Sequence, residues 1–106
     1  MPPLTAERLV FITLVDGVPT PSVDPVQLDT TKGHVAHWIF AGDGDLQITM
    51  KDVTPFDSPH EHAGQHVRSS IVRQDAEGGG RRYGYTITLT IGEDAFTNDP
   101  DIEIVP

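Results

Sequence analysis

Apolar and polar residues alternate strictly over positions 83–91, and this alternation constrains the fold more than any other feature of the sequence. The apolar members are Tyr83, Tyr85, Ile87, Leu89 and Ile91. Gly84 and three threonines lie between them. A period of two places alternate side chains on one face of a β-strand, and threonine is a strong strand former that tolerates a half-exposed face. The pattern predicts a strand with one buried face, on which Ile87 is buried.

The same period predicts further strands over residues 35–40, 46–50 and 101–104. A continuous run of β-branched and aromatic residues predicts a strand over 9–15, and residues 67–72 are a weaker strand candidate. The segment 35–40 is apolar on both faces, which is typical of a central strand. No segment has a clear helical period, although 5–10 and 93–96 could each form one helical turn.

Turn signals rich in glycine, aspartate and proline separate these segments. Pro19, Pro21 and Pro25 indicate an extended connection rather than a second domain. Strands at this spacing, joined by such turns, predict an all-β protein with an antiparallel β-sandwich of about seven strands.

Length and charge narrow the classes of protein further. We expect a single β-sandwich domain over residues 1–106. The chain has no cysteine, which excludes disulfides, thiolate metal sites and thiol nucleophiles. Its formal net charge of -9 argues against binding to nucleic acid or to an anionic membrane surface. With no apolar run long enough to cross a bilayer and no features of a secretory signal at the N-terminus, we expect a cytoplasmic protein.

Three stretches of the chain resemble the cupredoxin-like β-sandwich. They are Val35–Phe40 with the turn and strand that follow it, the segment from Gly80 to Ile87, and the closing segment Asp99–Val105. The resemblance covers roughly residues 26–106. It implies a Greek-key order of the strands.

This sequence lacks the ligands of the blue copper site that copper-carrying cupredoxins have. In copper-carrying members of the family, the strand with the Tyr-x-Tyr pattern leads into a cysteine that binds the metal, followed by a histidine and usually a methionine. Ile87 stands at the position of that cysteine, and no histidine follows His66. The turn after Trp38, where those proteins supply their first histidine, contains none. A blue copper centre needs a thiolate, so the resemblance implies a cupredoxin scaffold without its copper, and electron transfer is excluded.

Three of the five histidines lie within residues 58–66, which read Ser-Pro-His-Glu-His-Ala-Gly-Gln-His. On an extended chain His60 and His62 project to one side, and a turn at Gly64 would bring His66 to them. Three imidazoles beside a glutamate could bind Zn²⁺, Ni²⁺ or Cu²⁺. The alternatives are a polar exposed loop whose histidines bind nothing, or a loop that responds to pH. The two remaining histidines, either of which could reach this loop, are His34 and His37.

Basic residues gather between positions 68 and 82, whereas acidic residues crowd positions 93–103. Such a surface either keeps the chain in solution or docks an acidic partner. The triple glycine 78–80 predicts a hairpin tip, and the adjacent Arg81 and Arg82 could contact a partner or hold an anion.

The sequence contains no nucleophile elbow or phosphate loop, and its paired carboxylates lie in turns, so we expect no enzymatic activity. Trp38, Tyr83 and Tyr85 are predicted to belong to the core rather than to a ligand platform. We therefore expect a non-catalytic binding or protein-interaction module, with no cofactor, that contacts a protein partner through its loops or a sheet edge. The alternative is a metal-binding protein that holds a zinc, nickel or copper ion with His60, His62 and His66.

Overall fold

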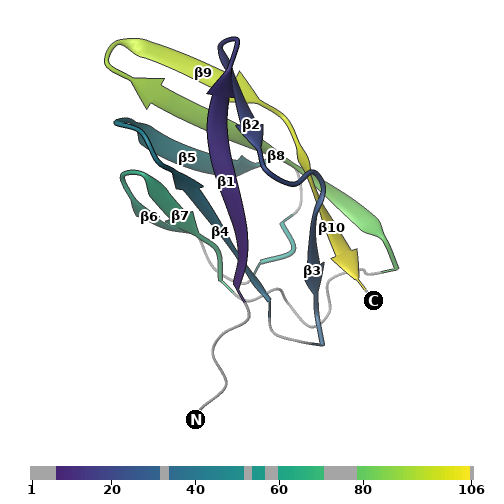
Figure 1. The fold of residues 1–106 in the computed structure, drawn as a ribbon. Helices are drawn as coiled ribbons and strands as arrows, with labels where there is room; N and C mark the ends of the chain where they lie inside the picture. The colour runs from purple at the N-terminus through teal and green to yellow at the C-terminus, as the bar shows by residue number, and fades with distance from the viewer. Residues whose placement is uncertain (1–6, 32–33, 52–53, 57–59, 71–78, 106) are drawn as a thin grey trace.

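The computed structural model describes residues 7–31, 34–51, 54–56, 60–70 and 79–105, and within these residues the regular secondary structure is entirely β (Figure 1). The ten strands are β1 (Glu7–Val15), β2 (Val18–Pro21), β3 (Val26–Asp29), β4 (Val35–Phe40), β5 (Asp45–Met50), β6 (Glu61–Ala63), β7 (His66–Arg68), β8 (Arg81–Ile91), β9 (Asp94–Asn98) and β10 (Asp101–Val105). The all-β prediction is thus confirmed for the described part of the chain. In the same residues there is no helix that could span a membrane.

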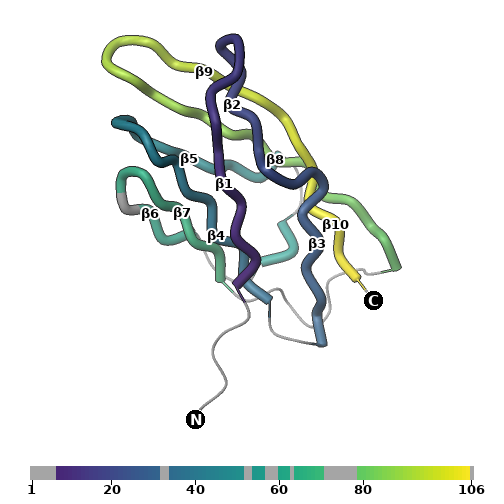
Figure 2. Tube along the Cα trace, viewed as in Figure 1, coloured from purple at the N-terminus to yellow at the C-terminus, as the bar shows by residue number. Residues whose placement is uncertain are grey.

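The strands form two sheets (Figures 1 and 2). Sheet 1 has the order β2-β1-β4-β7-β6, and sheet 2 has the order β3-β10-β8-β5 with β9 also paired to β8. β1 and β4 are parallel, as are β3 and β10, whereas the other pairs are antiparallel. The sheets are therefore mixed rather than purely antiparallel, because the chain visits sheet 2 as β3 between β2 and β4 and re-enters sheet 1 in the direction of β1.

The predicted alternation of residues 83–91 is confirmed in β8. Tyr83, Tyr85, Ile87 and Leu89 are buried and the residues between them are half-buried. Ile87 is fully buried, as predicted, at the middle of a strand that pairs with β5 on one side and with β9 and β10 on the other. β8 is therefore the central strand of sheet 2.

Side chains of both sheets meet in one hydrophobic core. Trp38 of β4 and Tyr85 of β8 are both 0% exposed, and their ring centroids lie 5.3 Å apart. The Trp38 Nε1–H group donates a hydrogen bond of 3.1 Å to the Tyr85 hydroxyl oxygen, which satisfies a buried donor across the two sheets. The core assignment of these aromatic residues is correct, and β4 is a central strand of sheet 1 as predicted.

Four strands lie where the sequence pattern did not predict one: β2, β3, β6 and β9. β2 contains Pro19 and Pro21, and it is an edge strand, the position in a sheet where proline is tolerated. It joins β1 through a two-residue turn in which Asp16 and Gly17 have φ of 51° and 76°, as a tight hairpin requires.

Two further expectations about local structure meet different outcomes. The helical turns expected at 5–10 and 93–96 are wrong within the described residues, because Glu7–Val10 belongs to β1 and Asp94–Phe96 to β9. The strand predicted over 67–72 is confirmed only in β7, and residues 71–72 lie outside the described residues.

Candidate functional site

Residues 61–68, which include most of the histidine-rich segment, form a β-hairpin, β6–β7, whose turn is Gly64–Gln65. Gly64 has a φ of +61°, a conformation that glycine adopts without strain. In this register His62 lies opposite Val67 and Ala63 lies opposite His66. Since successive side chains of a strand point to opposite faces, His62 shares a face with the buried Val67, whereas His66 lies on the other, outward face.

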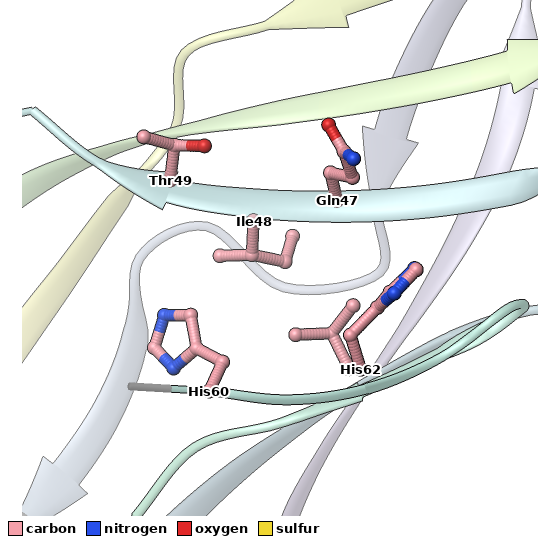
Figure 3. A pocket seen from close by; sticks show the side chains of 6 residues that line it. Gln47, Ile48, Thr49, His60 and His62 are labelled. Atoms are coloured by element: carbon pink, nitrogen blue, oxygen red, sulfur yellow. The ribbon is translucent and has the colours of Figure 1, made fainter. Parts of the chain in front are cut away.

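His60 and His62 line a hollow of about 360 Å³ between this hairpin and β5 (Figure 3). In the figure, Ile48 of β5 points toward the two imidazoles, while Gln47 and Thr49 point away from them. The residues that line the hollow are Gln47, Ile48, Thr49, His60, His62 and Val67. The hollow is thus lined by side chains of both sheets, with Ile48 of sheet 2 facing the two imidazoles.

The two histidines of the hollow have different surroundings. His60 packs against Trp38 and Phe56, with ring centroids 5.5 Å and 5.3 Å away, and its Nδ1 is buried without a hydrogen-bond partner in the described part of the chain. Burial lowers the pKa of His60, so this imidazole is neutral near pH 7. His62 is half-exposed, and its Nε2 lies 3.0 Å from Oδ1 of Asp45.

The predicted trio of His60, His62 and His66 is therefore divided between the two faces of the hairpin. Two of its members line the hollow and the third does not reach it. Within the residues that the structure describes, no group of three or more histidine or carboxylate side chains is placed to hold a metal ion. The zinc, nickel or copper site of the sequence analysis stays a prediction without a matching arrangement.

On the outer face of sheet 1, His66 meets His37 of β4. Nδ1 of His66 and Nε2 of His37 lie 3.1 Å apart. Nδ1 of His37 lies 3.1 Å from Oε2 of Glu7, and the same carboxylate oxygen lies 3.1 Å from Nε of Arg68. The four residues come from β1, β4 and β7, and we refer to them as the imidazole cluster.

Sequence reasoning named His37 only as a residue that could reach the histidine loop, and it missed Glu7. The alternation of side chains along β4 could have indicated this cluster. Trp38 is a core residue, so its neighbour His37 must face outward. The register that brings β7 and β1 beside β4 is set by long-range pairing and has no local signal.

The outer face of the β1–β2 hairpin carries exposed apolar side chains. Leu9, Phe11 and Val15 of β1 are 45%, 51% and 51% exposed, and Val18 of β2 is 41% exposed. Val15 and Val18 are cross-strand partners. We refer to these four residues as the β1–β2 face.

The candidate contact residues Arg81 and Arg82 begin β8 and are exposed. The guanidinium of Arg82 lies 3.8 Å from a carboxylate oxygen of Asp101 and 3.8 Å from one of Glu103, both on the adjacent β10. The guanidinium of Arg81 lies 5.3 Å from the ring centroid of Tyr83. The basic and acidic segments of the sequence therefore meet within one sheet, where Arg82 has carboxylates of its own chain as neighbours.

No known protein family matches this sequence, and no curated protein matches it. The fold and the candidate sites define the chain as an all-β protein with two mixed sheets around one core.

Proposed function

We propose that this chain is a non-catalytic binding module, on a cupredoxin-like scaffold without copper, that recognises a protein partner through the β1–β2 face. The observation that carries the proposal is the exposure of four large apolar side chains, each more than two-fifths accessible, on one hairpin. Single exposed apolar residues are ordinary on protein surfaces, whereas several on one face indicate an interaction site.

The four side chains form one strip. The positions of Leu9, Phe11 and Val15 on β1 differ by two and by four, so their side chains share a face. Val18, the cross-strand partner of Val15, extends that face onto β2. Thr13 and its cross-strand partner Thr20 lie between the two ends. From residue 9 to residue 15 the strip is about 20 Å long at the rise of a β-strand.

Charge favours a different protein over a second copy of this chain as the occupant of the strip. A formal net charge of -9 makes two copies repel each other. The carboxylate of Glu7, beside Leu9, is already bonded to Arg68 and His37 of its own chain. A partner with an apolar contact surface would match the strip, and basic residues at the rim of that surface would match the net negative charge of this chain.

The scaffold part of the proposal is supported by the two-sheet arrangement and by Ile87. This residue, which stands where copper-carrying cupredoxins have a cysteine, is fully buried in the core and offers no metal ligand. The predicted contact through Arg81 and Arg82 stays a prediction, and the carboxylates beside Arg82 would compete with an acidic partner.

The test is site-specific photo-crosslinking in cells that express the full chain. A photoreactive residue replaces Phe11 on the β1–β2 face or, as the matched control, the exposed Thr97 on the outer face of sheet 2. We expect crosslinks to a distinct protein from position 11 and not from position 97. Once purified, that protein should lose at least about fivefold in affinity for the Phe11→Ser variant, because truncation of a buried interface aromatic costs more than about 1 kcal/mol.

Two results would contradict the proposal. Equal crosslinking from both positions would place the contact elsewhere or make it non-specific. Crosslinks from position 11 only to a second copy of the chain would make the β1–β2 face a dimer interface.

A further inference from the structure

We infer that His37 and His66 are the two protein ligands of a divalent transition-metal site on the outer face of sheet 1, with Cu²⁺ as the ion that fits it best. His37 Nε2 and His66 Nδ1 lie 3.1 Å apart, and each of these atoms carries a lone pair in one tautomer of imidazole. This site is separate from the hollow beside β5 and from the two histidines that line it.

The pairing of β4 with β7 places the two imidazoles side by side. His37 lies opposite Arg68 and Ile39 lies opposite His66, so the two histidines are diagonal neighbours on one face of an antiparallel pair. Their ring centroids are 5.3 Å apart and the rings are tilted by 45°. Both residues belong to strands of a sheet, which holds their backbones more firmly than a loop would.

Glu7 determines which nitrogen of His37 is free to bind an ion. A carboxylate oxygen accepts hydrogen bonds, so the 3.1 Å contact with Glu7 Oε2 places the proton on His37 Nδ1 and the lone pair on Nε2. Arg68 bonds to the same oxygen and holds the carboxylate in position. Histidines that ligate metals commonly donate their second N–H group to a carboxylate in this way.

The separation of the two nitrogens suits a shared ion. With metal–nitrogen bonds of about 2.0 Å, two ligands of one ion lie about 2.8 Å apart at a right angle and about 3.3 Å apart at a tetrahedral angle. The observed 3.1 Å falls between these values. Without an ion, His66 Nδ1–H donates to His37 Nε2; ion binding requires the His66 proton to move to its own Nε2, which faces away from the shared site.

The number and type of ligands favour copper. In the described part of the chain, no third histidine or carboxylate joins the pair as a ligand, so water would complete the coordination. Imidazole suits copper, zinc and nickel, and among divalent ions Cu²⁺ binds a given set of nitrogen ligands most tightly. The positive charge of Arg68 lies near the site, and together with the two-ligand set it leads us to expect micromolar affinity for Cu²⁺ and weaker affinity for Zn²⁺.

The experiment is a titration of the full, tag-free, metal-stripped chain with Cu²⁺ alone. Binding is measured by calorimetry and by electron paramagnetic resonance. We expect one ion per chain with nitrogen ligation. His37→Gln and His66→Gln should each weaken binding by more than about tenfold, and Glu7→Gln by about tenfold, the usual effect of removing a carboxylate behind a ligating histidine. The matched control is His62→Gln, which also removes one histidine of the hairpin and should leave the affinity unchanged.

NMR of the unaltered chain identifies the histidines that bind the ion, so this test does not depend on whether a variant folds. Sub-stoichiometric Cu²⁺ should broaden the imidazole NMR signals of His37 and His66 before those of His60 and His62. Loss of binding in His62→Gln, or first broadening of His60 and His62, would place the ion in the hollow and overturn the inference. Equal small losses in all histidine variants, or no binding by the unaltered chain, would overturn it as well.

Discussion

The hydrogen bond between Trp38 and Tyr85 gives the most direct test of how the two sheets are held together. Both side chains are 0% exposed, and the Tyr85 hydroxyl accepts the Trp38 Nε1–H bond at 3.1 Å. Tyr85→Phe keeps the ring that fills the core but leaves a buried N–H group without its acceptor. An unsatisfied buried donor costs about 1–3 kcal/mol, so the free energy of unfolding should fall by that amount in urea denaturation.

A double-mutant cycle separates this loss from any change in packing. In a Trp38→Phe background there is no Nε1–H group to leave unsatisfied, and Tyr85→Phe should cost less there than in the unaltered chain. Equal costs of Tyr85→Phe in both backgrounds would refute the role given to the hydrogen bond. A cost below about 0.5 kcal/mol in the unaltered chain would mean that the donor finds another acceptor.

The same substitution has a second readout at alkaline pH. Burial raises the pKa of Tyr85 and outweighs the lowering by the Trp38 hydrogen bond, and the negative charges of Asp24 and Asp101 add smaller upward contributions. The folded chain therefore keeps this proton after the unfolded chain has lost it, and stability should fall as the pH rises above about 10. The decline should be shallower in Tyr85→Phe.

Two further predictions concern single side chains. Ile87→Ala should lower the free energy of unfolding by about 2–5 kcal/mol, because it removes a fully buried aliphatic group. Thr88→Ala on the half-buried face should cost at most about 1 kcal/mol. A cost near zero for Ile87→Ala in urea denaturation would mean that the faces of β8 are assigned backwards. Burial lowers the pKa of His60 in the folded state, so the unfolded chain takes up this proton first, and stability present above about pH 6.5 should be lost as the pH falls below it. His60→Gln should lessen that acid loss in thermal unfolding between pH 7 and pH 5, and an unchanged pH profile would contradict the burial of His60.

The strands that could be predicted from the sequence are those whose alternation is long and whose buried face is apolar. β8 has nine alternating positions, and β4 is apolar on both faces because it is central in sheet 1. β2 and β9 could not be predicted in this way, because proline in one and a mostly polar composition in the other mask the period. Their pairing partners, β1 and β8, fix them as strands, and pairing is a long-range property. The parallel contact of β1 with β4 is unpredictable for the same reason.

The histidines illustrate how one residue of turn length decides which side chains can act together. The sequence suggested that a turn at Gly64 would bring His66 to His60 and His62. With the two-residue turn Gly64–Gln65, His66 pairs with Ala63 and faces outward. A three-residue turn over 63–65 would instead make His62 and His66 cross-strand partners on one face, since a shift of one residue in register exchanges the faces of a strand. A glycine at position 64 is compatible with either turn. Because His66 lies on the outward face of β7, it does not reach the hollow and instead lies against His37. We therefore assign the metal site to the outer face of sheet 1.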